Sequence, residues 1–395
     1  MSLEEQFQAI ARLVAGARDV LDARPSDGTP PTPVVERGWA SFLASLADDE
    51  VDAFESCDFP AVLPRDTPAS LRALIEQARD STRLPSLPAR AVVARSLRSR
   101  ESARKREQVD AFTNMVVPLA ARAKRVVDVG AGHGHLTRAV AAGLALPVLG
   151  LERDHDLARR ARTLGGDGST FAITDVLRDG LPVVESDCVI GLHACGELGD
   201  AIVVHAAHAG AAIALVGCCL QKRRQTVRRA LSPDDVLGEA LDLPRATLGL
   251  SNLTARDDGV EATRKETLAA RERRLALRRL LEEDGTKMRP GAEIEGLNRR
   301  VAQGELSSLV TRAFVLRARP VPSPAAIAEA ASWAHVHHAR MRRFALPRSI
   351  LARPLEVFVL LDRARHLETR GYQVTVGVLF PASVSARNLV LGARR

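Results

Sequence analysis

The chain has 395 residues, of which 46% are apolar, and its formal net charge is +8. This length allows a sizeable core and more than one domain. No run reaches the ~18 apolar residues of a membrane span, and the acidic start Met-Ser-Leu-Glu-Glu lacks the basic region of a signal peptide. Five cysteines, four of them in two close groups, favour reduced thiols over a secreted disulfide framework. We therefore expect a cytoplasmic protein.

The positive charge is compatible with an anionic partner such as RNA, and equally with the arginine-rich composition of a GC-rich genome. Aromatic residues make up only 3% of the chain, with a single tyrosine, Tyr372. A platform of rings for stacking single-stranded bases is therefore not expected. Any RNA contact would depend on phosphate binding by Arg and Lys.

The first part of the chain, residues 1–90, is predicted to be an N-terminal helical region. Phe7, Ile10 and Val14 recur at helical spacing, and a linker rich in Pro and Gly follows at 26–33. A basic segment then leads into the first predicted strand.

Residues 126–136, Val-Val-Asp-Val-Gly-Ala-Gly-His-Gly-His-Leu, predict a buried strand that breaks into a glycine turn and opens a helix. Glycines let the backbone turn and approach a ligand, and the helix directs its first N–H groups at that ligand. A dinucleotide fingerprint would need a third glycine where His135 stands. The pattern instead resembles motif I of the class I S-adenosylmethionine (SAM) methyltransferases. The cofactor-binding residues that this resemblance implies are Asp128, Gly130, Gly132 and Gly134.

Two carboxylates strengthen the prediction of a nucleoside site. Glu152 ends the next predicted strand, about 20 residues after the glycines, where a carboxylate can bind ribose hydroxyls. Asp175 and Val176 follow the third predicted strand, where the fold needs an acceptor for the adenine amino group. Each carboxylate alone is weak evidence, but in series with the glycine turn they predict a bound SAM.

Strands and helices alternate over residues 95–220, which predicts a parallel, doubly wound sheet. Residues 221–350 are expected to form a basic, mostly helical insertion. A closing helix and hairpin in 351–395 resemble the last elements of the class I methyltransferase sheet, where an antiparallel strand inserts beside the fifth. We therefore expect an α/β fold with a Rossmann-like, seven-stranded sheet in one discontinuous catalytic domain. The first five predicted strands are 126–129, 147–151, 170–174, 188–192 and 211–217.

The loops after the fourth and fifth predicted strands should meet, because these strands are neighbours and ligands bind at their carboxyl ends. The first loop contains His193 and Cys195, and the second contains Cys218 and Cys219. All four are candidate catalytic residues beside the methyl donor.

Four interpretations of this cluster stay open. Cys195 and Cys218 resemble the two-cysteine scheme of RNA 5-methylcytosine enzymes, although Ala194 replaces the usual proline. His193 with the cysteines has the stoichiometry of a zinc site, but tight two-residue cysteine spacings are absent and we assign no metal ligand from the sequence. His193 could serve as an acid, a base or a positioning group. Small buried residues could instead simply let the loops pack tightly.

Basic residues follow the paired cysteines directly, so they would surround the mouth of the site. Lys222, Arg223 and Arg224 are the candidates for binding substrate phosphates, and a solvated helix face is the alternative. His335, His337 and His338 are expected on a surface helix, and Cys57 is expected to be inert.

Both loops resemble those of the methyltransferase-like protein 25 group, which has a His-x-Cys-Gly-[Asp/Glu]-Leu loop and a Gly-Cys-Cys loop. Residues 248–253, 361–363 and 385–389 match further segments of that group. A more distant similarity is to the 2′-O-methyltransferases of the tRNA acceptor stem, whose paired cysteines are followed by histidines. Leu220 and Gln221 stand there instead.

The sequence therefore predicts a SAM-dependent methyltransferase that modifies RNA, either tRNA or rRNA, with structured RNA as its partner. A methyltransferase acting on a protein or a small molecule is the alternative within this class. A non-enzymatic SAM-binding regulatory module is the alternative outside it.

Overall fold

The computed structural model describes residues 2–25, 28–55, 62–87, 102–166, 168–234, 236–253, 264–283, 285–289, 291–298, 301 and 304–395. It divides into two compact units, each built from segments distant in the sequence. Unit 1 comprises Met1–Asp22, Leu74–Asp258 and Ile350–Arg395, and unit 2 comprises Ala23–Ala73 and Gly259–Ser349. In the described part of the chain, no helix has both the length and the apolar character that crossing a bilayer requires.

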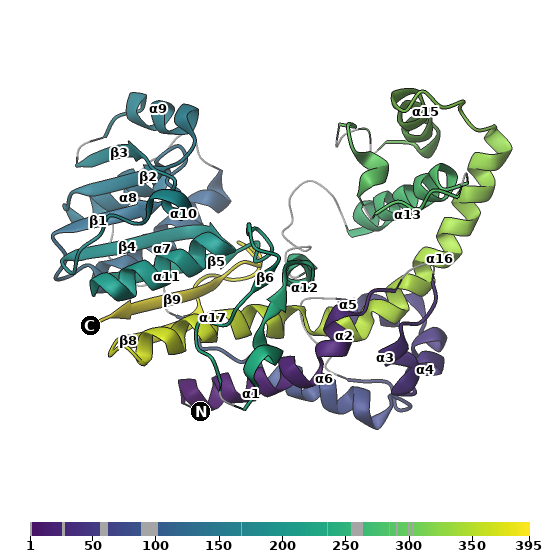
Figure 1. Cartoon of the computed structure of the whole chain (residues 1–395), viewed down its shortest axis with the longest axis horizontal. Helices are drawn as coiled ribbons and strands as arrows, with labels where there is room; N and C mark the ends of the chain where they lie inside the picture. Colours follow the sequence, from purple (N-terminus) through teal and green to yellow (C-terminus); the bar gives the residue numbers. More distant parts are fainter. Residues whose placement is uncertain are drawn as a thin grey trace. The chain divides into compact units, whose positions relative to one another are not determined.

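Unit 1 is organised around a seven-stranded sheet with the order β3-β2-β1-β4-β5-β9-β8 (Figure 1). Strands β1 to β5 are parallel, whereas β9 lies antiparallel between β5 and β8. This arrangement confirms the predicted fold class, including the inserted antiparallel strand. The strands are β1 (Arg125–Val129), β2 (Val148–Glu152), β3 (Ser169–Ile173), β4 (Asp187–Cys195), β5 (Ala212–Cys218), β8 (Gln373–Val378) and β9 (Leu389–Arg394).

Both faces of the central strands are buried, which explains their continuous apolar runs. Val126, Ile190 and Val216 face one core cluster, together with α7 (Ala103–Leu119) and α8 (His135–Leu144). The alternate residues face the other side, where Gly191 approaches Ile202 of α11 (Glu197–Ala209). Helix α17 (Ala352–Glu368) also covers this second side.

Shorter elements complete unit 1. Helix α1 (Leu3–Gly16) packs along α17, with the rings of Phe7 and Phe358 stacked 6.1 Å apart. The chain after β5 forms a small two-stranded sheet and short helices before it leaves the unit. These further elements are α2 (Arg18–Asp22), α9 (His155–Thr163), α10 (Val176–Asp179), β6 (Val227–Arg228), η1 (Gly238–Leu241), β7 (Leu243–Pro244), α12 (Arg245–Leu248) and η2 (Gly249–Leu253).

Unit 2 is helical and has its own apolar core, formed by residues such as Leu277, Val310 and Phe314. Its acidic helix α5 (Asp48–Glu55) pairs with basic side chains of α16 (Pro324–Ile350): Asp52 and Glu55 both accept from Arg342. The remaining helices are α3 (Thr32–Glu36), α4 (Ala40–Ser45), α13 (Arg264–Leu281), η3 (Ala292–Ile294) and α15 (Leu306–Leu316), and α6 (Ala69–Ser81) runs from unit 2 into unit 1. The predicted insertion at 221–350 is thus divided, since unit 1 extends to Asp258.

Candidate active site

The glycine turn follows β1 directly and has left-handed backbone angles. The φ angles of Gly130, Gly132 and Gly134 are 79°, 56° and 74°, values at which a side chain is strained. A Cβ on Gly132 would have no atom within 4 Å, whereas one on Gly134 would lie 2.4 Å from the ring of Phe171. Gly132 therefore borders open space where a ligand can approach, and Gly134 permits packing against β3.

Asp128 lies in the sheet just before this turn and is 2% exposed. Its carboxylate accepts a hydrogen bond of 2.7 Å from the hydroxyl of Thr137 on α8. Burial raises the pKa of Asp128 to about 6, against the lowering effect of Thr137, and the nearby charge of Glu152 raises it further. A positive charge close to this buried carboxylate would stabilise its ionised form.

Glu152 ends β2 and binds the glycine turn. Its carboxylate accepts from the backbone N–H of Gly132 at 2.9 Å and from that of Asp154 at 2.9 Å. The two bonds hold both oxygens in a fixed orientation at the carboxyl end of the sheet, next to the open side of Gly132.

Asp175 caps α10 by accepting from the backbone N–H of Leu177, and its other oxygen accepts from Arg224 at 2.9 Å. Val176 is buried beside it. Because β1, β2 and β3 are adjacent and parallel, their carboxyl ends bring the turn, Glu152 and Asp175 to the same edge of the sheet (Figure 1). The structure thus places the predicted cofactor-binding residues together.

His193 leaves the β4 ladder at a shift of register between Leu192 and Ala194. Its φ angle of 65° lies in the left-handed region, which is strained for a residue with a side chain. Its ring Nε2 lies 2.8 Å from the side-chain oxygen of Gln108, whose amide nitrogen donates to the carbonyl of Val384. This orientation of Gln108 makes Nε2 the donor, so the lone pair of a neutral His193 lies on Nδ1.

The three thiols meet at the ends of β4 and β5. Cys195 and Cys218 are register partners, their sulfurs are 2.9 Å apart, and both sulfurs lie within hydrogen-bond distance of the carbonyl of His193. With Cys219, whose φ is 36°, all three sulfurs lie within 4.8 Å of one another. The structure therefore brings the three predicted cysteines together. The ring of His193 instead contacts the side chain of Gln108 through Nε2.

Cys219 differs from its neighbours because a cation approaches it. Arg387 donates to its sulfur at 2.9 Å and also to the side chain of Asn252 at 3.0 Å. Hydrogen bonds from Cys195 and Cys218 lower the pKa of the Cys219 thiol well below its usual range, and the charges of Arg387 and Lys222 lower it further. Of the three thiols, Cys219 is therefore the one that these contacts favour most as a thiolate.

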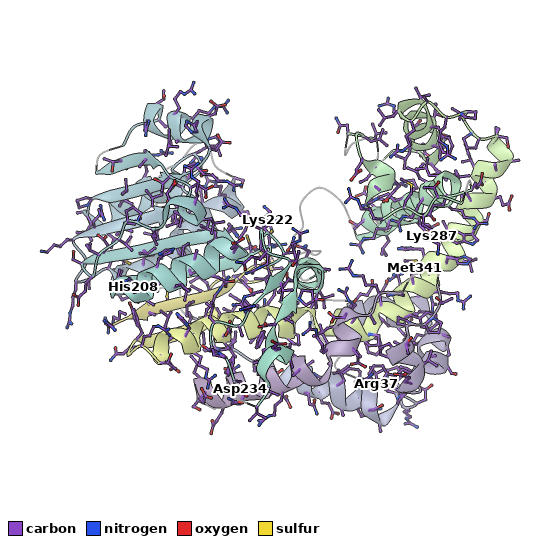
Figure 2. The ribbon with its side chains drawn as sticks, in the orientation of Figure 1. Arg37, His208, Lys222, Asp234, Lys287 and Met341 are labelled. Carbon is purple, nitrogen blue, oxygen red and sulfur yellow. The ribbon has the colours of Figure 1, made fainter. Side chains whose placement is uncertain are left out.

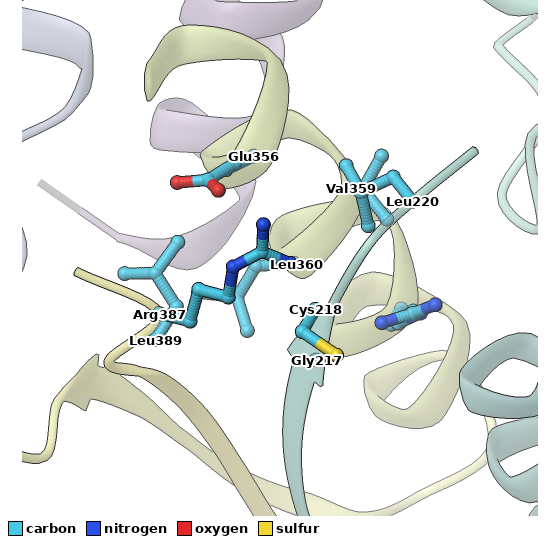
Figure 3. A pocket seen from close by; sticks show the side chains of 9 residues that line it. Gly217, Cys218, Leu220, Glu356, Val359, Leu360, Arg387 and Leu389 are labelled. Carbon is cyan, nitrogen blue, oxygen red and sulfur yellow. The ribbon is translucent and has the colours of Figure 1, made fainter. Parts of the chain in front are cut away.

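A cavity of about 30 Å³ lies beside this cluster, and Cys218, Glu356 and Arg387 are among its lining residues (Figure 3). A space of this size holds a water molecule or two. It cannot hold a nucleobase.

A buried ionic network supports both loops. Asp200 on α11 binds Arg228 and Arg363, Asp362 binds Arg228 at 2.6 Å, and Arg363 also donates to the carbonyl of Gly196. Burial would raise the pKa of Asp200, but the charges of Arg228 and Arg363 hold it well below its usual range. The network joins the loop after β4 to β6 and α17.

The three residues predicted to bind substrate have different environments. Lys222 is exposed (Figure 2), and Arg224 is 56% exposed although it pairs with Asp175. The side chain of Arg223 is only 4% exposed and pairs with Asp200. Arg223 therefore belongs to the buried network, and Lys222 and Arg224 remain at the surface.

Two further sequence predictions concern residues outside this site. His335, His337 and His338 are on α16, where His335 faces Glu272 and His337 stacks on Trp333. Cys57 lies outside the described residues.

Several residues that build the site could not be found from the sequence pattern. Gln108 is on α7, far from His193 in the chain, and nothing around it marks a partner for a histidine. Arg387 and Asp362 stand in segments that we singled out by resemblance, without a role. Arg387 contacts Cys219 and Asp362 binds Arg228 only in the folded protein, and these contacts give the two residues their roles.

Residues 104–226 match the family model described as a methyltransferase domain. The chain carries a methyltransferase domain. The matched residues begin in α7 and end after β5, so they include the glycine turn, Glu152, Asp175 and both cysteine loops. The open side of Gly132 beside two carboxylates fits a cationic nucleoside such as S-adenosylmethionine.

Solved methyltransferases are among the structurally similar chains. One, in complex with the Trm112 methyltransferase activator of Haloferax volcanii, is 18% identical, with 30% of this chain and 61% of that chain covered and a TM-score of 0.20. The plantazolicin methyltransferase BpumL is 15% identical, with 38% and 62% covered and a TM-score of 0.22. Coclaurine N-methyltransferase is 11% identical, with 79% and 92% covered and a TM-score of 0.26. The chain thus spans about three fifths of the first two proteins, and TM-scores this low carry no information on the acceptor.

Proposed function

We propose that the protein transfers the methyl group of SAM to an RNA, with tRNA or rRNA as the acceptor. The observation that carries the methyl-transfer part is the bond from the Gly132 N–H to Glu152, because it aligns a ribose-binding carboxylate with the open side of the glycine turn. Asp128 lies behind the same turn, where a carboxylate can oppose a cation.

SAM and the residues of the protein have separate roles in the proposed reaction. SAM supplies a methyl group on a positively charged sulfur. Glu152 and Asp175 bind and orient the nucleoside, and Asp128 stabilises its positive end. His193, whose lone pair is on Nδ1, accepts the proton that the acceptor atom loses. The three loop cysteines, Cys195, Cys218 and Cys219, shape the acceptor site at the ends of β4 and β5.

Charge and resemblance support RNA as the acceptor. Lys222 is exposed beside the site, and residues 259–349 contain 18 Lys or Arg against 10 Asp or Glu. The two cysteine loops resemble those of the methyltransferase-like protein 25 group and, more distantly, of the tRNA acceptor-stem 2′-O-methyltransferases. Phosphate contacts by such residues provide affinity without sequence preference.

The proposal is tested by supplying SAM with a radioactive methyl group to the purified protein together with RNA or protein fractions from a strain that lacks the gene. We expect label in an RNA nucleoside, identified by mass spectrometry, and much less label with Glu152→Ala when SAM is kept below saturation. Label in protein or in a small molecule alone would refute RNA as the acceptor.

Substitutions in the loops separate an enzyme from a SAM-binding regulatory module. We expect His193→Ala to fold and to bind SAM as the wild type does, but to lose methyl transfer by about 10²- to 10⁴-fold. Equal rates for the two proteins would remove His193 from the mechanism. SAM binding without transfer to any fraction would favour the regulatory module.

A further inference from the structure

The three thiols at the ends of β4 and β5 are arranged differently from a buried structural cysteine. Cys188, lower in β4, is fully buried in the apolar core, and burial raises its pKa to about 12. Cys195 and Cys219 are partly exposed at the carboxyl edge of the sheet, and Cys218 lies at the same edge. Their sulfurs contact one another, a carbonyl and a guanidinium. Packing of small residues does not account for this.

The separations suit a single metal ion. Ligands at about 2.3 Å from a tetrahedral zinc lie roughly 3.8 Å apart. The Cys195 and Cys218 sulfurs are 2.9 Å apart, and no pair in the group exceeds 4.8 Å. The ideal spacing falls within this range, so small side-chain rotations suffice to reach it.

The surrounding charge suits a metal with three thiolate ligands. One Zn²⁺ with three thiolates has a net charge of −1, which needs a nearby cation. Arg387 supplies it, since its guanidinium lies 2.9 Å from the Cys219 sulfur and is held there by Asn252. A hydrogen bond of this kind to a ligand sulfur is what outer residues of metal sites provide.

We propose that Cys195, Cys218 and Cys219 bind one Zn²⁺ ion through three thiolates, with Arg387 compensating the charge. Thiolates select zinc over the hard cations Mg²⁺ and Ca²⁺. The described residues offer three ligands here, which is the number of protein ligands in zinc sites that keep the fourth position for water or a substrate. Among the described residues, the group whose ligand atoms lie close enough to share one ion consists of the three cysteines and does not include His193.

The direct test is the metal content of the full-length protein purified under reducing conditions. We expect about one zinc per chain in the wild type and less than a tenth of that in Cys218→Ser. Cys188→Ala is the matched control, since it removes a thiol of the same strand system outside the group, and it should keep its zinc. Retained zinc in Cys218→Ser would overturn the proposal.

A second measurement needs no variant. Stripped wild-type protein is titrated with Co²⁺ under anaerobic conditions, and we expect tetrahedral absorption with a thiolate-to-metal charge-transfer band that saturates at one equivalent. No such band would overturn the proposal, as would a Cys195–Cys218 disulfide in the reduced preparation. Arg387→Ala should lower the affinity for the metal about 10- to 100-fold, measured by competition with a chelator.

These measurements use neither SAM nor RNA, so they are independent of the proposed function. A zinc-loaded protein that methylates no RNA would contradict the acceptor and leave the metal site standing. A metal-free protein that methylates RNA would do the reverse.

Discussion

Asp128 combines a structural cost with its proposed role in binding the cofactor, because its carboxylate is buried and its pKa is raised to about 6. A raised pKa means that the folded state favours the protonated form, so the stabilisation is present at acidic pH and is lost as pH rises through about 6. At neutral pH the ionised form therefore lowers the stability of the folded protein.

We predict that Asp128→Asn increases the free energy of unfolding at pH 7.5 by up to about 3 kcal/mol, the equivalent of a shift from 3.8 to about 6. The gain should increase between about pH 4 and pH 6 and stay constant above pH 7. Chemical denaturation over this pH range is the measurement. A variant that is less stable than the wild type at pH 7.5 would contradict the prediction.

The same substitution should abolish most SAM binding, because the neutral amide no longer opposes the positive charge of the ligand. For the wild type, we predict that affinity falls below about pH 6 as Asp128 takes up a proton. Calorimetric titration with SAM between pH 5 and pH 8 checks this. A flat profile would mean that Asp128 does not oppose the cation.

We predict that Glu152→Ala weakens SAM binding by about 10- to 150-fold, the equivalent of a charge-assisted hydrogen bond of roughly 1.5–3 kcal/mol. The carboxylate also accepts from Gly132, so the turn becomes less ordered as well. Glu152→Gln keeps one acceptor oxygen and should lose less affinity. An unchanged calorimetric affinity in Glu152→Ala would contradict the assignment.

At the scale of elements, the glycine turn has two constraints that can be separated. Gly132→Ala adds a methyl group that meets no atom within 4 Å, so only the backbone strain of roughly 1–2 kcal/mol opposes it. Gly134→Ala places its methyl group against Phe171 at 2.4 Å and has the same strain.

We predict that Gly132→Ala stays folded and loses SAM affinity, whereas Gly134→Ala loses much more stability. Thermal unfolding and calorimetry of the two variants distinguish the effects, with Phe171→Leu added to Gly134→Ala as a rescue. If both variants lose stability equally, the open side of Gly132 is not the ligand side.

The ionic network between α11, β6 and α17 is predicted to be essential for folding of the site. Asp362→Asn leaves Arg228, which is fully buried, without one of its two carboxylates, and should cost about 3–5 kcal/mol. Arg159→Ala removes an ion pair that is exposed on both sides and should change stability by less than about 0.5 kcal/mol. A loss as small in Asp362→Asn would mean that the network contributes little.

At the scale of the whole molecule, charge should govern the proposed RNA binding. We predict that the affinity for structured RNA falls linearly with the logarithm of salt concentration, and that Lys222→Ala reduces the slope by about 1. Arg159→Ala, on α9, is the control and should leave the slope unchanged. Fluorescence titration at several salt concentrations is the measurement, and a flat response would argue against RNA.

The sheet and the glycine turn could be predicted because local patterns determine them: three of the four residues in 126–129 are valines, and Gly130 and Gly132 need their backbone angles regardless of partners. The division into two units could not, because it depends on contacts between segments distant in the sequence. The burial of Arg223 could not be predicted either, because Arg223 and Lys222 stand in the same basic segment of the sequence. Only the position of Asp200 turns it inward.

Strand β9 has a consequence for how the protein is made. It pairs Ala393 with Ile213 and separates β5 from β8, so the sheet is completed only after a strand far along the chain from β5 has left the ribosome. Until then β5, an apolar strand, has an unpaired edge that can join with other chains. Closing so long a loop is also entropically costly and slow. Nascent chains of this protein should therefore depend on chaperones until β9 has been synthesised.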